Sequence, residues 1–154
     1  MVGGAQGSAA RDAVVGGTAA GATDGPLIVY ADTSALMKLV RAEDGTTALQ
    51  RWLAEHRPRL VTSAIGGVEL RRAAARVSAD HVATAEALLT QIGLLQVAPA
   101  TLDLAARVAP PTLHTLDALH LAAVVMIADL DAVLCYDDRL AQGLSRIGLK
   151  VEAP

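Results

Sequence analysis

Four acidic residues stand beside apolar segments that lie far apart in the chain: Asp32, Glu69, Asp117 and Asp137. Taking a carboxylate out of water is costly unless a partner compensates its charge. No basic run lies close enough in sequence to neutralise all four, and carboxylate oxygens are the ligands that hard divalent cations prefer. The pattern therefore predicts a metal-dependent hydrolase of phosphate esters.

Composition limits how such a site is built and what it binds. With 154 residues, 53% of them hydrophobic, the chain suits one domain with a full core. A net charge of -3 argues against a broad basic surface for nucleic acid, and one Trp, two Tyr and no Phe argue against a platform for base stacking. Any RNA contact must therefore be local, and the candidates are Arg71, Arg72, Arg76 and Arg139.

The remaining composition favours a soluble cytoplasmic protein. The single Cys135 excludes an intrachain disulfide and suits a reducing compartment. The apolar stretch 124–136 is interrupted by Asp129 and Asp131, so it is too short and too charged to span a membrane. The N-terminus does not have the basic and apolar regions of a secretory signal.

Strands alternating with helices are expected from residue 27 onward. Residues 1–26 are rich in Gly and Ala and suggest a disordered tail, which leaves 27–154 as the domain. Apolar runs predict strands at 27–31, 59–63, 94–98, 132–136 and 150–152. Helical periodicity predicts helices at 34–41, 46–55, from about 68, 79–92, 101–109, 115–128 and 139–147. The alternation indicates an α/β sandwich around a mostly parallel sheet of four to five strands.

Ligands of such sheets bind outside the carboxyl ends of the strands. Asp32 and Asp137 both follow predicted strands and fall at this edge. Helices packed at the same edge can add Glu69 and Asp117. One acidic pocket built from four distant segments is therefore expected.

These residues, in this order, resemble the PIN domain, and within it the VapC toxins of bacterial toxin-antitoxin pairs. The resemblance spans about residues 27–153, and its matching stretches are YADTSALMKLV, TSAIGGVELRRA, TLDALHLAA and CYDDRLAQGLSRIGLKV. It implies a PIN-like three-layer α/β/α sandwich. The four motifs together are specific, whereas each alone occurs by chance.

The resemblance also implies an activity and a set of partners. The expected activity is a Mg²⁺- or Mn²⁺-dependent endoribonuclease in which Asp32, Glu69 and Asp117 bind the metal, while Asp137 binds a second metal or orients the attacking water. The expected partners are RNA, a VapB-like antitoxin and a second copy of the chain. Which RNA is cut does not follow from the residues.

Several of these residues have a structural alternative. Thr33 and Ser34 suit either hydrogen bonds to a ligand carboxylate or helix capping. Asp117 suits a first-turn acid that interacts with the helix dipole, and Glu69 suits a surface pair with Arg72. His120 is expected to be a buried, hydrogen-bonded structural residue rather than a catalyst.

At the end of the last long apolar run, Asp137 is favoured as the ligand, with one of Asp137 and Asp138 capping the next helix. Cys135 replaces a hydroxyl residue frequent in relatives, which predicts a weaker contact to the metal site. His114 stands where relatives often have Arg, and it is a candidate phosphate contact when protonated. The pair Gly66-Gly67 predicts a helix that either starts late, near Val68, or is locally flexible.

Three other classes were weighed against the nuclease. A haloacid-dehalogenase-type phosphatase needs an Asp two residues after its nucleophile, where this chain has Ser34. A receiver-type signalling module needs an early acidic cluster and a late Lys after a strand, and neither is evident. A non-catalytic PIN-like interaction module with a vestigial metal site is the remaining alternative.

Overall fold

The computed structural model describes residues 25–108 and 110–154. The expectation of a disordered tail over residues 1–26 lies almost entirely outside these residues, and of that segment only Gly25 and Pro26 are described, both exposed.

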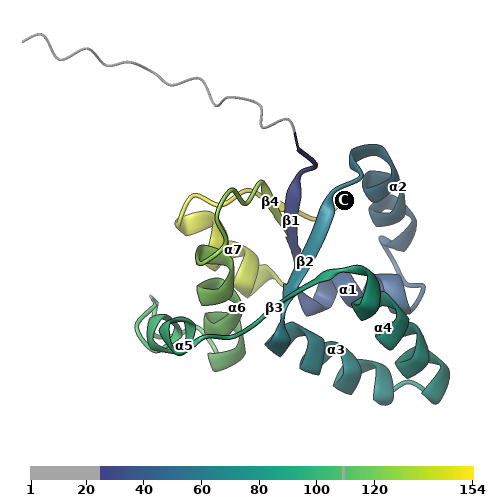
Figure 1. The fold of residues 1–154 in the computed structure, drawn as a ribbon, viewed down its shortest axis with the longest axis horizontal. Helices are drawn as coiled ribbons and strands as arrows, with labels where there is room; N and C mark the ends of the chain where they lie inside the picture. Colours follow the sequence, from purple (N-terminus) through teal and green to yellow (C-terminus); the bar gives the residue numbers. More distant parts are fainter. Residues whose placement is uncertain (1–24, 109) are drawn as a thin grey trace, which may run out of the picture.

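A parallel sheet of five strands forms the centre of the described part of the chain (Figure 1). Its strands are β1 (Ile28–Ala31), β2 (Arg59–Ser63), β3 (Gly93–Leu95), β4 (Ala132–Leu134) and β5 (Val151–Glu152). They lie in the order β3-β2-β1-β4-β5, and each neighbouring pair is parallel. In the central strand β1, Tyr30 is level with Val61 of β2 and Val133 of β4.

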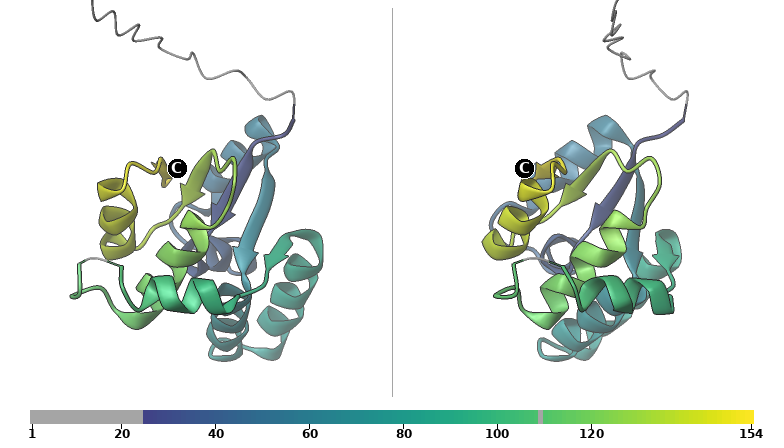
Figure 2. Two further views of the ribbon diagram at one scale, coloured as in Figure 1. Left: turned by 60° about the vertical axis from the view of Figure 1, so that its left-hand side comes forward. Right: turned by 90° about the vertical axis from the view of Figure 1, so that its left-hand side faces the viewer.

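Seven helices among the described residues cover the two faces of the sheet. They are α1 (Thr33–Val40), α2 (Thr46–His56), α3 (Ala64–Ala75), α4 (Ala79–Gln91), α5 (Pro99–Ala105), α6 (Thr115–Val125) and α7 (Asp138–Arg146). Helices α1 to α4 lie on one face and α5 to α7 on the other (Figure 2). This confirms the predicted three-layer α/β/α sandwich.

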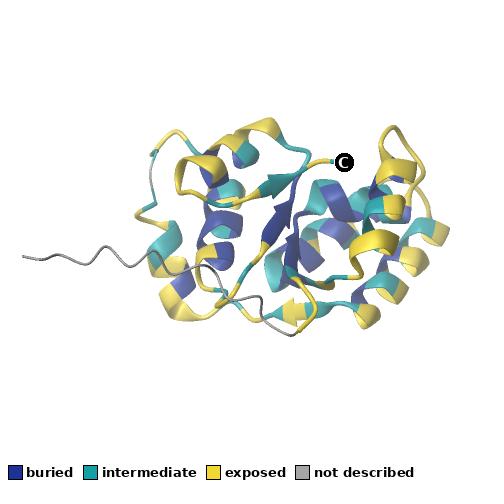
Figure 3. Ribbon diagram, turned by 90° about the horizontal axis from the view of Figure 1, so that it is seen from above, coloured by how far each residue is buried: buried dark blue, intermediate teal, exposed yellow. Residues whose placement is uncertain are grey.

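The alternation of side chains along β1 produces two separate cores. Val29 and Ala31 point into the core that β1 shares with α1 to α4, together with Leu36 and Leu70. Tyr30 points to the opposite side, into the core formed with α6 and α7. Figure 3 shows the result, with buried residues along the central strands and exposed residues on the outer faces of the helices. A strand buried on both faces explains the continuous apolar run that begins the domain.

Two predictions about local structure are wrong for identifiable reasons. Helix α3 begins at Ala64, not near Val68, because Ser63 caps it and accepts a hydrogen bond from the Gly66 backbone N–H at 3.0 Å. The helix predicted at 101–109 begins earlier, at Pro99, whose fixed φ suits the first turn of α5.

The predicted elements otherwise match the observed ones with shifted ends. The strand at 59–63 is observed with its predicted bounds, whereas the last long apolar run is strand only over Ala132–Leu134. The helix predicted over 115–128 ends at Val125. None of the helices in the described part of the chain combines the length and apolarity needed to cross a membrane.

Candidate active site

Asp32 follows the central strand β1 and is almost fully buried, with 4% of its surface exposed. It is the N-cap of α1, and its Oδ1 accepts hydrogen bonds from the Ala35 backbone N–H at 2.9 Å and from the Ser34 hydroxyl at 2.7 Å. Its Oδ2 accepts a bond from the Cys135 thiol at 3.3 Å. Burial raises the pKa of Asp32, and this effect outweighs the hydrogen bonds that lower it.

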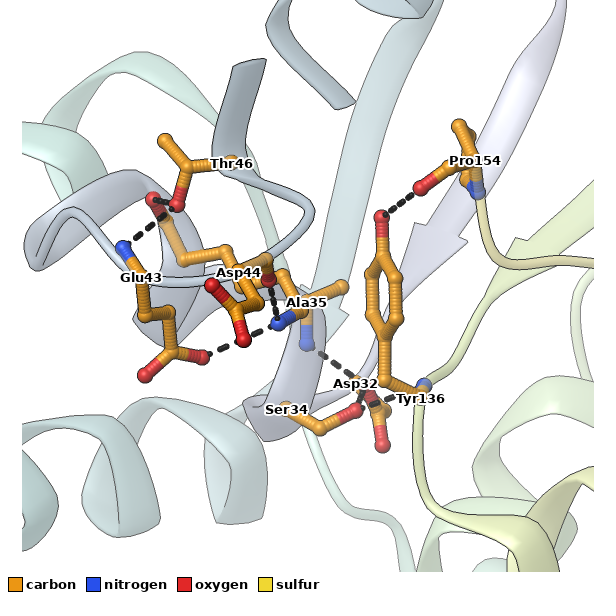
Figure 4. A network of polar contacts seen from close by, with 9 residues as sticks. Asp32, Ser34, Ala35, Glu43, Asp44, Thr46, Tyr136 and Pro154 are labelled. Carbon is orange, nitrogen blue, oxygen red and sulfur yellow. Dashed lines mark hydrogen bonds and ion pairs between the residues drawn. The ribbon is translucent and has the colours of Figure 1, made fainter. Parts of the chain in front are cut away.

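Ser34 connects this carboxylate to the segment that follows β4. Its hydroxyl donates to Asp32 and its oxygen accepts from the Tyr136 backbone N–H at 2.8 Å, as Figure 4 shows. The Tyr136 hydroxyl in turn donates to the backbone carbonyl of Pro154 at 3.1 Å. Because Asp32 performs the capping itself, Ser34 is free for the predicted contact with a carboxylate.

Glu69 lies on α3 and is held by two residues from other elements. Its Oε2 accepts a hydrogen bond from the Thr33 hydroxyl at 2.9 Å and lies 2.5 Å from Nε2 of His120. Burial raises the pKa of Glu69, but the hydrogen bond and charge of His120, with the bond from Thr33, lower it further, so the net pKa is below its usual value. Glu69 therefore pairs with His120 instead of Arg72, the alternative partner.

His120 is buried, as predicted, and bonded through both ring nitrogens. Its Nδ1 lies 2.6 Å from the Tyr30 hydroxyl, and the two rings meet edge-on with centroids 5.9 Å apart. The Tyr30 hydroxyl also lies 3.1 Å from Ser63 Oγ. Burial raises the pKa of Tyr30 to about 12, so this hydroxyl keeps its proton at neutral pH. The contact between His120 and Glu69 is a feature of the site that sequence reasoning missed.

Asp117 lies in the first turn of α6, one helical turn before His120. Its Oδ2 is buried and has no hydrogen-bond partner among the described residues. A buried carboxylate oxygen without a partner is costly, so its occurrence in a folded protein points to a missing ligand. Interaction with the helix dipole also remains available to it at this position.

Asp137 performs the capping that was left open between Asp137 and Asp138. Its Oδ1 accepts from the backbone N–H groups of Arg139 and Leu140 at 2.9 and 3.0 Å. Its Oδ2 lies 3.9 Å from the Arg139 guanidinium. Asp138 is the exposed first residue of α7. One oxygen of Asp137 thus serves the helix while the other remains accessible to a ligand.

Hydrogen bonds connect three of the four acids to one another's neighbourhood, whereas Asp117 has no such contact among the described residues. Asp32 and Asp137 follow neighbouring strands, and the Cys135 sulfur lies within hydrogen-bond distance of both the Asp32 carboxylate and the Asp137 backbone carbonyl. Glu69 contacts His120, which lies one helical turn after Asp117 on α6, and Thr33, the residue after Asp32, donates to Glu69. In the part of the chain that the structure describes, no three His, Cys, Asp or Glu side chains form a group that could hold a metal ion.

Two hollows flank the acids and carry basic side chains. One has a volume of about 410 Å³ and includes Glu69, Arg72 and Arg76 in its lining. The other, of about 320 Å³, includes Asp117, His114, Arg139 and Arg146. Cations thus stand on both sides of the acidic edge, in positions suited to phosphate groups.

Two of the arginines predicted as RNA contacts, Arg139 and Arg71, have partners of their own. The Arg139 Nη1 lies 3.0 and 3.1 Å from the two ring nitrogens of His114. Arg71, the third member of the predicted cluster, makes a two-bond pair with Glu86, at 2.7 and 3.1 Å.

A three-layer sandwich with acidic residues at the carboxyl edge of its parallel sheet defines a recognisable class. Residues 29–143 match the family model of the PIN domain, and the chain belongs to this family. Two curated relatives come from Mycobacterium tuberculosis strain CDC 1551 / Oshkosh. Ribonuclease VapC47 is 37% identical over 132 residues and Ribonuclease VapC35 is 35% identical over 131, each match covering 82% of this chain and 97% of the relative. These relatives confirm the predicted resemblance to VapC proteins.

Solved structures show the same fold. The crystal structure of VapC20 from Mycobacterium tuberculosis, described as a sarcin-ricin loop cleaving toxin, has a TM-score of 0.67 at 18% identity. The match covers 82% of this chain and 99% of VapC20. A toxin-antitoxin complex from Klebsiella pneumoniae gives a TM-score of 0.65 at 15% identity, covering 82% of this chain and 98% of the other.

Proposed function

We propose that this chain is a metal-dependent endoribonuclease that acts as the toxin of a toxin-antitoxin pair and hydrolyses phosphodiester bonds of RNA. The observation that carries the proposal is the placement of Asp32 and Asp137 directly after two neighbouring parallel strands, with Glu69 bonded to Thr33 beside Asp32. It occurs in a chain 37% identical to Ribonuclease VapC47. Relatives at this identity share a fold, and the acids supply the chemistry that a phosphodiesterase requires.

The carboxylate chemistry of these residues suits Mg²⁺ or Mn²⁺, although in the described residues no three of them form a metal-binding group. Asp117 offers a buried oxygen without a protein partner, and the raised pKa of Asp32 marks a buried carboxylate with too little compensating charge. Asp32, Glu69 and Asp117 would hold the ion through oxygen atoms, the ligand type that hard divalent cations prefer. When bound, such a cation lowers the pKa of water and offsets negative charge on phosphate.

The protein's own contribution is to hold these carboxylates in place. Asp32 is fixed by α1 and Ser34, and Glu69 is fixed by Thr33 and His120. Asp137 is fixed by the first turn of α7 and would orient the attacking water or contribute to a second metal site. Carboxylates anchored in this way need little reorganisation when substrate binds.

The basic residues that flank the acids would bind RNA phosphates. Arg72 and Arg76 lie on the Glu69 side, and His114 and Arg139 lie on the Asp117 side. With a net charge of -3 the chain does not attract RNA through its whole surface, so recognition rests on these local contacts. The RNA that is cut is not defined by these residues.

We further propose a VapB-like antitoxin and a second copy of the chain as protein partners. Support for the antitoxin comes from the fold shared with the toxin-antitoxin complex from Klebsiella pneumoniae. An acidic edge flanked by arginines suits a partner segment that carries both charges.

A non-catalytic interaction module is the second candidate. It is favoured by the fact that, among the described residues, no three potential ligands form a group able to hold a metal. In that case the acids would serve only to bind the antitoxin or another protein.

Cleavage of a mixed RNA panel by antitoxin-free protein distinguishes the two candidates. The protein is assayed with Mg²⁺ or Mn²⁺ and with EDTA, beside Asp32→Asn and the matched control Asp138→Asn, which changes an exposed acid on α7. We expect metal-dependent cleavage in the wild type and the control and its loss in Asp32→Asn. Equal activity in all three proteins would indicate a contaminating nuclease, and inert wild-type protein that still binds an antitoxin would support the interaction module.

A further inference from the structure

We infer that His120 is a positioning residue that sets the orientation of the Glu69 carboxylate for metal binding, and that Tyr30 in turn orients the His120 ring. The inference deepens the proposed function and rests on it. It assigns a role in the reaction to a histidine that the sequence presents only as a core residue.

The hydrogen-bond pattern requires His120 to donate to Glu69. A carboxylate has only acceptor atoms, so the Nε2 that lies 2.5 Å from Glu69 Oε2 must carry a hydrogen. If the Tyr30 hydroxyl donates to Nδ1, the ring is neutral; if it donates to Ser63, Nδ1 carries the second hydrogen. In both arrangements Nε2–H faces Glu69, so the positioning role does not depend on how the ring is charged.

The two contacts of Glu69 restrict which oxygen is available to a ligand. Both Thr33 and His120 bond to Oε2, and they approach from α1 and α6 respectively. A free glutamate on a helix samples many rotamers, and ordering one costs conformational entropy. Because Oε2 is held from two directions, Oε1 is the oxygen left for the cation. The side-chain entropy of Glu69 is then lost when the protein folds and not when the metal binds.

A glycine in α3 provides the space for this contact. A Cβ at Gly66 would lie 3.3 Å from His120 Cε1, tighter than ordinary packing, so the ring lies against the helix where no side chain is present. Gly in a helix interior costs about 1 kcal/mol relative to Ala. Close approach of the His120 ring to α3 offers a physical reason to keep Gly66 at this position.

The ring itself is rigidly supported. Only 3% of the His120 surface is exposed, and the Tyr30 side chain that contacts Nδ1 is fully buried in the central strand. Outer partners of this kind orient a metal ligand, and their loss typically reduces metal affinity by roughly 10- to 100-fold.

The test is the dissociation constant for Mn²⁺ alone, measured from the electron paramagnetic resonance signal of the free ion in RNA-free protein. His120→Leu removes the donor, whereas His120→Gln places an amide N–H near the position of Nε2. The control is His56→Gln, which changes an exposed histidine on α2. We expect His120→Leu to weaken Mn²⁺ binding by about 10- to 100-fold, His120→Gln to restore most of the affinity, and the control to match the wild type.

Circular dichroism of each variant shows whether it is folded, so that a loss of Mn²⁺ affinity is not confused with a loss of structure. Should His120→Leu not fold, Tyr30→Phe replaces it, because it removes only the hydroxyl that orients the ring. Unchanged Mn²⁺ affinity in a folded His120→Leu or Tyr30→Phe variant would overturn the positioning role and leave the proposed function intact. Equal losses in His120→Leu and His120→Gln would overturn it also. Wild-type protein that does not bind Mn²⁺ would overturn the proposed function and the inference together.

Discussion

The Cys135 thiol donates to the Asp32 carboxylate across neighbouring strand ends, with Sγ 3.3 Å from Oδ2. The same sulfur lies 3.4 Å from the Asp137 backbone carbonyl, so one side chain touches both segments that supply acids to the centre of the sheet edge. Sequence reasoning expected Cys135 to weaken the contact to the site. The structure shows that the thiol still makes a hydrogen bond, although sulfur is a weak donor.

Removing this thiol should raise the pKa of Asp32. Cys135→Ala deletes a hydrogen bond that lowers this pKa, and Cys135→Ser retains an O–H donor. We therefore expect a higher Asp32 pKa in the alanine variant than in the wild type or the serine variant. Carboxyl-carbon NMR titration of metal-free protein measures it, and identical titrations in all three proteins would show that the thiol has no influence.

Asp32→Asn should stabilise the metal-free protein at neutral pH. Burial raises the folded-state pKa above the ordinary value of 3.8, so the folded chain holds the proton more tightly than the unfolded chain. The wild type therefore loses stability as pH rises from that ordinary value through the raised pKa, and asparagine avoids this loss. Urea unfolding should show equal stability at acidic pH, below both pKa values, and a gain for the variant at pH 7.

Glu69→Gln should show the opposite dependence. The folded-state pKa of Glu69 is lowered by His120 and Thr33 despite burial, so ionised Glu69 contributes stability that is present above the unfolded pKa and lost as pH falls through the folded pKa. Glutamine removes this contribution, which makes the variant less stable than the wild type at pH 7 and closer to it in acid. Parallel pH profiles for the two variants would contradict both assignments.

Mg²⁺ or Mn²⁺ should raise the melting temperature of the wild type. A ligand present at 100 times its Kd stabilises the folded state by about 2.7 kcal/mol, and in a domain of this size each kcal/mol corresponds to roughly 2–4 °C. Differential scanning calorimetry should show this shift in the wild type and in Asp138→Asn, and a much smaller one in Asp117→Asn. An equal shift in all proteins would place the ion elsewhere.

Gly66→Ala should destabilise the protein, and Gly67→Ala should not. A Cβ at Gly66 would lie 2.5 Å from Thr62 Oγ1, on a buried and stiff β-branched residue, so we expect a loss of about 1–3 kcal/mol. A Cβ at Gly67 meets the ends of Arg71 and Leu94 at 3.2 and 3.3 Å, which are flexible side chains. At Gly67, alanine should therefore raise the free energy of unfolding by about 1 kcal/mol, because alanine favours the helix more than glycine does. Urea unfolding of the two variants and the wild type measures both changes.

Arginines of the 71–76 segment should differ in their effect on RNA binding. Arg71 is paired with Glu86, whereas Arg72 and Arg76 line the hollow beside Glu69. The logarithm of the RNA-binding constant falls linearly with the logarithm of the salt concentration. For single-stranded RNA, the loss of one phosphate contact makes this slope shallower by about 0.7. Titrations of RNA at several salt concentrations should show this change for Arg72→Gln and Arg76→Gln, with Arg71→Gln as the matched control. Equal slopes for all three variants would contradict the predicted difference between Arg71 and the two arginines that line the hollow.

The sequence predicted the parallel sheet and the edge where the acids lie, because both follow from local patterns. Apolar runs ending in Asp identify β1 and β4, and ligands of such sheets bind at the carboxyl ends of their strands. The start of α3 was missed because the helix propensity of glycine was weighed without Thr62 and His120, whose side chains require space there.

The contact between His120 and Glu69 depends on how α3 packs against α6, and no local pattern encodes it. The two residues are 51 positions apart in the chain. One signal was nevertheless present, since a histidine in a helix that is apolar on nearly every face must find a partner for its ring nitrogens. Its two partners are Glu69 and the Tyr30 hydroxyl.

The strand order has a consequence for the chain during its synthesis. Asp32 and Glu69 leave the ribosome early, but β4, which pairs with β1 and leads to Asp137, is among the last elements to emerge. Since β1 lies between β2 and β4, the sheet edge that carries the acids is incomplete until then. A nascent chain of this protein thus carries Asp32 and Glu69 without Asp137 until β4 has emerged and paired with β1.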